Sequence, residues 1–129
     1  MTSPNPILAP VSPVADARLA VHPLGLDQVT VTGGFWGHWQ RLNRDVTTPH
    51  ALGWLERDGS VENLRRLSGG DRTAPHRGFW FSDSDVYKVL EAISWDLARS
   101  PAAELTRAVA GLVSVLRGAG RLSRGPLSR

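Results

Sequence analysis

The residues best suited to chemistry lie in the stretch FSDSDVYK, which holds the carboxylates Asp83 and Asp85 followed by Tyr87 and Lys88. Paired carboxylates are the usual catalytic groups of glycoside hydrolysis, where they flank the scissile bond from opposite sides. Asp83 and Asp85 are two residues apart on one expected helical turn. They therefore cannot flank a bond, and we assign no catalytic residue to this chain.

Two interpretations of this stretch stay open. In the first, which we prefer, Ser82 or Asp83 caps a helix and Asp85 complements its dipole, and such a cap stabilises a helix by about 1 kcal/mol. In the second, the four side chains Asp83, Asp85, Tyr87 and Lys88 line the rim of a substrate-binding pocket. A surface ion pair of Lys88 with Asp85 or Glu91 fits either interpretation, because both spacings are helical.

An aromatic run, Phe79, Trp80 and Phe81, directly precedes the acids. Aromatic rings stack on sugars, and they also fill protein cores. We predict that this run packs in the core.

Other catalytic and metal-binding patterns are missing from the sequence. The chain has no cysteine, which excludes disulfides, cysteine-based zinc sites and thiol nucleophiles within it and is compatible with a reducing compartment. Its four histidines show no ligand spacing, so we predict no metal site. They are His22, His38, His50 and His76. We also find no G-x-S-x-G motif and no phosphate-binding loop.

The first half of the chain reads as a leader followed by short elements. Residues 1–24 are rich in proline and are expected to be disordered. The alternating residues in QVTVTGG predict one short strand. A helix over 35–43 follows, with an interruption near Pro49 because proline disfavours helix at the residue before it.

The remainder of that half should hold one more helical piece and a loop. The segment HALGWLER reads as helical and ends at Asp58-Gly59. Residues 59–80 contain SGGDRTAPHRG and are predicted to form a loop.

The second half predicts a helical hairpin. Apolar residues at helical spacing run along residues 85–99 and again along 102–117. We expect Ser100 to cap the second helix, Pro101 to occupy its first position, and Gly118 to end it. With almost no loop between them, the two helices should pack antiparallel.

Charge is distributed unevenly. Residues 1–104 carry 10 basic and 12 acidic side chains, whereas residues 105–129 carry five arginines and no acid. The abundance of arginine over lysine is typical of GC-rich bacterial genes. With no export signal or membrane-length apolar run visible, we expect a cytoplasmic protein and no membrane partner.

The phrases VTVTGGFWGHWQRLNRD, TTPHALGWLERDG and RGFWFSDSDVYKVLEAISWDLARSPAAELTRAVAGLVSVL resemble, in order and spacing, the beginning of beta-L-arabinofuranosidases of glycoside hydrolase family 127. One departure is Val89, where the family usually has Trp. The resemblance implies a mostly α fold, namely the first three to four helices of an (alpha/alpha)6 barrel, after one short strand. It implies hydrolysis of terminal beta-L-arabinofuranosyl linkages, in carbohydrate catabolism, by a cysteine nucleophile near zinc.

The resemblance divides the chain into a leader (1–24), a partial barrel domain (25–117) and a basic, non-homologous tail (118–129). Without cysteine the chain cannot supply the family's nucleophile or zinc site, so we expect no cofactor in this chain and zinc only in the full-length enzyme. We therefore interpret it as an N-terminal fragment, inactive alone. We also hypothesise that a frameshift produced the tail.

Partners follow from the same reasoning. An arabinoside would bind only the intact enzyme, and exposed apolar helix faces would favour self-association. An alternative stays open, in which the chain is a small helical binding module with a basic tail. The tail lacks interleaved aromatic residues for base stacking, so we do not expect nucleic acid.

Overall fold

A computed structural model describes residues 21, 23–69, 71 and 73–122 of the chain. The described part is mostly helical, as predicted. Most of the leader and residues 123–129 of the tail lie outside it. In chain order its elements are a 3-10 turn η1 (Leu26–Gln28), α1 (Gly34–Leu42), a π-helical turn η2 (Asn43–Thr47), α2 (Thr48–Arg57), α3 (Ser60–Leu67), α4 (Asp83–Arg99) and α5 (Ala103–Leu122).

The predicted strand is absent from the described residues. The backbone at Val29 is extended, with φ −127° and ψ 122°. Val29 and Val31 are nevertheless 48% and 37% exposed, and the described residues form no strand to pair with them. Alternation of valine and threonine expresses a local preference, and a strand also needs a partner that shares its hydrogen bonds.

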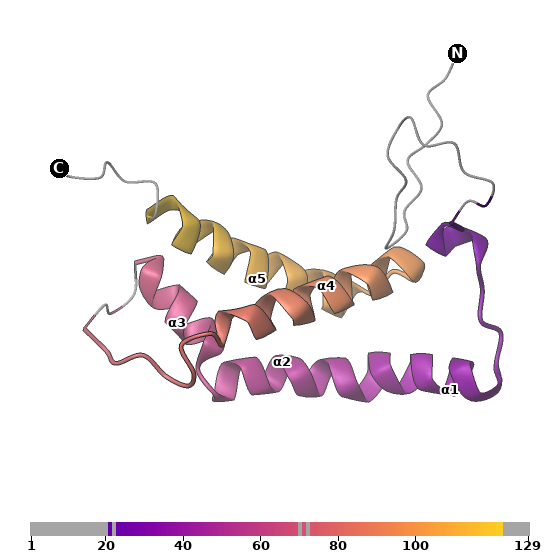
Figure 1. The fold of residues 1–129 in the computed structure, drawn as a ribbon, viewed down its shortest axis with the longest axis horizontal. Helices are drawn as coiled ribbons and strands as arrows, with labels where there is room; N and C mark the ends of the chain where they lie inside the picture. Colours follow the sequence, from indigo (N-terminus) through magenta and orange to yellow (C-terminus); the bar gives the residue numbers. More distant parts are fainter. Residues whose placement is uncertain (1–20, 22, 70, 72, 123–129) are drawn as a thin grey trace, which may run out of the picture.

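Pro49 does not break the helix that precedes it. Segments α1, η2 and α2 follow one another without a gap and form one rod (Figure 1). Thr48 keeps helical dihedrals of −64° and −49°, and its N–H bonds to the carbonyl of Asn43, five residues earlier. A wider π-helical turn therefore absorbs the proline, whose ring would otherwise clash with a carbonyl four residues before it.

The predicted loop over residues 59–80 is wrong at its start, where α3 forms. Gly59 has a φ of 93°, a left-handed conformation that lets the chain turn sharply after α2. The amide of Ser60 donates to Asp58 Oδ1 over 2.8 Å. Val61 and Leu64 are buried, so tertiary packing stabilises a helix too short to stand out in the sequence.

Helices α4 and α5 form the predicted antiparallel hairpin (Figure 1). Their boundaries differ from prediction, because Ser100 is extended and ends α4, and α5 begins only at Ala103. Nor does Gly118 end α5. A Cβ atom at Gly118 would lie 2.5 Å from Ser68 Cβ, so this glycine permits close packing of the end of α3 on α5.

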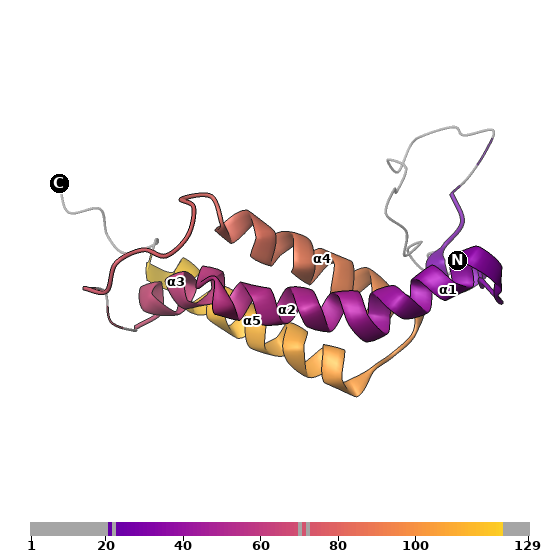
Figure 2. The same cartoon turned by 90° about the horizontal axis from the view of Figure 1, so that it is seen from below.

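The core lies where α2, α3, α4 and α5 meet. The rod of α1 and α2 lies across the α4–α5 pair, and α3 fills one end (Figures 1 and 2). The buried residues of this core come from all four helices: Leu55, Val61, Leu64, Val86 and Leu112. Among the described residues no helix is long and apolar enough to span a membrane.

Large apolar side chains remain exposed outside this core. The aromatic residues concerned lie on α1, on α2, on the α3–α4 connection and on α4. They are Phe35, Trp36, Trp39, Trp54, Phe79, Trp80, Phe81 and Tyr87. On α4, by contrast, Val86 and Ile93 are fully buried. Whether the exposed faces cause self-association stays a prediction.

Candidate functional site

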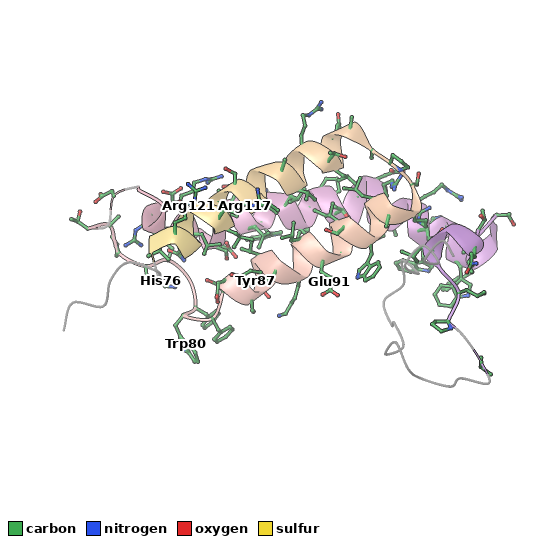
Figure 3. The ribbon with its side chains drawn as sticks, turned by 90° about the horizontal axis from the view of Figure 1, so that it is seen from above. His76, Trp80, Tyr87, Glu91, Arg117 and Arg121 are labelled. Atoms are coloured by element: carbon green, nitrogen blue, oxygen red, sulfur yellow. The ribbon has the colours of Figure 1, made fainter. Side chains whose placement is uncertain are left out.

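A groove lies between α3, the α3–α4 connection and the first turn of α4. Its volume is about 650 Å³. Figure 3 shows that connection at one end of the helices, with Trp80 pointing outward from it. The side chains of ten residues line the groove: Ser60, Asn63, Leu64, Arg66, Leu67, His76, Trp80, Ser82, Asp83 and Ala119.

The α3–α4 connection is held against α3 by side-chain hydrogen bonds. Asn63 Nδ2 donates to the carbonyl of Arg77 over 2.8 Å, and the amide of Arg77 donates back to Asn63 Oδ1 over 3.0 Å. Arg66 donates from Nε to the carbonyl of Asp71 and from Nη1 to that of Pro75, over 3.0 and 2.9 Å. Asn63 and Arg66 thus hold the connection in place and fix one wall of the groove.

Three polar groups of the groove keep capacity for a ligand. Asp83 is exposed, and its carboxylate makes no hydrogen bond or ion pair with another described residue. His76 Nε2 lies 3.1 Å from the carbonyl of Phe79, to which it donates, and in the neutral imidazole Nδ1 can then accept. Ser60 is 1% exposed, and its buried Oγ has no hydrogen-bond partner in the described part of the chain.

The prediction that the aromatic run packs in the core is wrong. Phe79, Trp80 and Phe81 are 71%, 85% and 49% exposed. The rings of Phe79 and Phe81 stack at 5.4 Å between centroids, and Trp80 meets Phe81 edge to face. Aliphatic residues fill the core, and three consecutive rings on a connecting segment cannot all face inward.

Of the four predicted rim residues, the structure brings only Asp83 into the groove. Asp85 pairs with Lys88 across 2.9 Å, in a contact that leaves the two side chains 53% and 72% exposed. Tyr87 is half exposed and lies outside the lining. Glu91 accepts a bond from Trp95 Nε1 over 3.3 Å, so Asp85, not Glu91, is the partner of Lys88.

The capping interpretation of the acids is also corrected. Ser82 occupies the cap position of α4, but no side-chain oxygen there accepts a backbone N–H bond. The dihedrals of Ser82 are already helical, φ −64° and ψ −16°, so the preceding turn runs into the helix without the extended geometry of a cap. Asp83 and Asp85 remain in the first turn, where their charge complements the dipole.

The opposite end of α4 carries a network that the sequence did not reveal. Arg44 donates from Nε to Asp96 Oδ2 over 2.6 Å, from Nη1 to Ser100 Oγ over 3.0 Å, and from Nη2 to the carbonyls of Asp96 and Ser100 over 3.0 and 2.6 Å. Arg99 donates to Asp96 Oδ1 over 2.6 Å. Because Arg44 and Asp96 are 52 residues apart, no local pattern could have indicated the contact.

Asp96 is the group of this network whose titration is displaced. Burial alone would raise the pKa of its carboxyl, but hydrogen bonds from Arg44 and Arg99, together with their charges, lower that pKa below the usual value. The carboxylate therefore stays ionised within the network at neutral pH. We call the network of Arg44, Asp96, Arg99 and Ser100 the joint, because it connects η2 to the C-terminal end of α4.

Helix α5 offers a second hollow, of about 710 Å³, whose lining residues all come from that helix. Val109 and Val113 form its apolar part, and Arg117 and Arg121 lie toward its C-terminal end (Figure 3). Since no second element contributes to it, this is an open helix face and not a built site.

Metal ligands do not converge in the part of the chain that the structure describes. No group of three or more histidine and acidic side chains there lies close enough to hold an ion. Together with the lack of cysteine, this means that the described residues do not fit a zinc site of the cysteine type.

Comparisons with known proteins identify relatives. Residues 28–128 match a family model described as the beta-L-arabinofuranosidase GH127 catalytic domain. A solved structure described as the GH127 beta-arabinofuranosidase BT3674 is 33% identical and superposes with a TM-score of 0.66 over 73% of this chain. The chain spans only 15% of the length of that relative. No match was found among the curated proteins.

Proposed function

Because the chain belongs to the GH127 family of beta-L-arabinofuranosidases, we propose that its helices form one part of a catalytic domain that hydrolyses terminal beta-L-arabinofuranosyl linkages. The observation that carries this proposal is the family match over residues 28–128. Agreement of fold and of one third of the aligned residues with a solved GH127 protein supports it.

Within such a domain, the chain would contribute substrate binding and not bond cleavage. The free carboxylate of Asp83 can accept hydroxyl hydrogens of a sugar at the groove. Asp85 is neutralised by Lys88 and lies outside the groove lining, so the two acids have separate environments and cannot share the work of an acid and a nucleophile. A cysteine nucleophile and zinc ligands would have to come from other parts of the domain.

We propose further that the chain by itself does not hydrolyse arabinosides, and that it works in the cytoplasm in carbohydrate catabolism. The absence of cysteine from the sequence supports the first statement. No feature of the described residues favours the alternative, a binding module with a basic tail.

A chimera tests the function. The segment of the solved GH127 relative that superposes on this chain is replaced by residues 28–122, and release of nitrophenol from a nitrophenyl beta-L-arabinofuranoside is measured. We expect turnover by the folded chimera and none by the 129-residue chain. Turnover by this chain alone, or a folded chimera that is inactive, would refute the proposal.

A further inference from the structure

We infer that the groove beside the first turn of α4 is a sugar-binding subsite, which holds a neutral furanose ring between Trp80 and Asp83. The inference rests on the proposed function for the class of sugar. It goes beyond it in assigning specific residues, and in predicting that this chain binds a sugar without the family's catalytic centre.

The free polar groups of the groove suit a polyhydroxylated ligand. Asp83 and His76 Nδ1 are acceptors without a described partner, and sugar hydroxyls are donors. Ser60, which lines the same groove, leaves a buried hydroxyl unsatisfied, and a buried polar group in that state calls for a partner outside the chain. A ligand hydroxyl, or a water that it holds, would supply this partner.

The apolar part of the groove suits the C–H face of a sugar ring. Leu64, Leu67 and Ala119 line it, and Trp80 offers an indole that is 85% exposed at its edge. An exposed indole at the edge of a groove is a stacking platform for a ring with an apolar face. The volume of about 650 Å³ falls within the range of about 300–1,000 Å³ usual for small-molecule sites.

The charges of the groove favour a neutral ligand over an anionic one. Arg66 is the single arginine or lysine of the groove, and its Nε and Nη1 already donate to the carbonyls of Asp71 and Pro75. Asp83 adds a negative charge that would repel phosphate or a sugar acid. A neutral glycoside meets both conditions.

The test is a saturation-transfer NMR titration of the full 129-residue chain with methyl beta-L-arabinofuranoside. The matching beta-L-arabinofuranosyl disaccharide is titrated in parallel, to distinguish a site for the terminal sugar from one for the sugar next to it. We expect saturable binding, weakened at least about tenfold by Asp83→Ala, since this variant removes a hydrogen bond to a charged group. Trp80→Ala should weaken it about fivefold.

Two matched variants serve as controls. Asp85→Ala removes an acid from the same helical turn, and Trp36→Ala removes an indole that is 70% exposed on α1. Both should bind within twofold of the parent chain. Circular dichroism checks folding, and Asp83→Asn repeats the test if Asp83→Ala loses helicity.

Two results would overturn the subsite. One is a folded chain that shows no saturation transfer up to the solubility limit of both sugars, and the other is equal weakening by the test and control variants. The chimera separates this failure from failure of the proposed function. If the chimera carrying Asp83→Ala keeps its KM, the subsite is refuted and the function stands; if the chain binds sugar but the chimera is inactive, the function fails and the subsite stands.

Discussion

The two ends of helix α4 are built in opposite ways. At the C-terminal end, Arg44 donates four hydrogen bonds to Asp96 and Ser100, and Asp96 accepts a further one from Arg99. At the N-terminal end, the carboxylate of Asp83 has no described partner, and the preceding aromatic residues are exposed.

The two carboxylates illustrate two uses of a charge: one stabilises the fold, and the other is available to a ligand. A partly buried charge that is fully hydrogen-bonded holds elements together, because removing it leaves its partner buried without an opposite charge. A carboxylate without a partner beside a groove contributes little to stability and is free to bind. We therefore propose that the same helix is a joint at one end and a recognition surface at the other.

The largest expected effect is at the joint. Arg44→Met should lower the free energy of unfolding by about 3 kcal/mol, because it leaves Asp96 partly buried and without its main partner. Urea denaturation followed by circular dichroism measures this. Arg41→Met, on the exposed face of α1, should change it by less than about 0.5 kcal/mol. Equal losses in both variants would show that Arg44 is no joint.

Acid should weaken the joint selectively. The folded pKa of Asp96 lies below its unfolded value near 3.8, so the carboxylate adds stability above about pH 4 and this stability is lost as the pH falls through the folded pKa. Unfolding curves at several pH values between 2 and 6 measure it. Asp96→Asn should flatten this acid dependence, and an unchanged slope would contradict the role of Asp96.

A matched pair of glycines tests the packing of α3 on α5. Gly118→Ala should destabilise the chain by about 1–2 kcal/mol, because the new Cβ would overlap Ser68. At Gly111 a Cβ meets no atom within 4 Å, so Gly111→Ala should stabilise α5 by up to about 1 kcal/mol. Thermal unfolding of both variants gives the comparison, and a gain at both positions would refute close packing at Gly118.

The smallest effect is expected for the exposed pair near the groove. Lys88→Met removes an ion pair whose side chains are 53% and 72% exposed, and such pairs contribute about 0–1 kcal/mol. A shift in the urea midpoint close to that of Arg44→Met would mean that both ends of α4 are joints.

Sequence patterns predicted the helices whose apolar residues recur at helical spacing. The apolar stripes of α4 and α5 and the paired packing of these helices were read correctly, because helical periodicity records which face is buried. Helix α3 was missed since its stability comes from Val61 and Leu64 in a shared core. The strand was predicted from alternation alone, without a partner strand.

The site was predicted less completely than the fold. Asp83 was identified from the run of acids before a predicted helix, whereas Asn63, Arg66 and His76 join it only because α3 and the α3–α4 connection lie beside α4. The joint of Arg44 and Asp96 depends on the π-helical turn at Pro49, which no spacing rule reveals. Contacts between distant residues need the tertiary fold.

The most direct test compares the urea midpoints of Arg44→Met and Asp83→Ala with and without methyl beta-L-arabinofuranoside. A ligand that binds only the folded state raises the midpoint in proportion to its affinity. We predict that Arg44→Met lowers the midpoint strongly but keeps the rise caused by the sugar, whereas Asp83→Ala changes the midpoint little and loses the rise. Loss of the rise in both variants, or an equal fall of the midpoint in both, would contradict the division of labour between the two ends of α4.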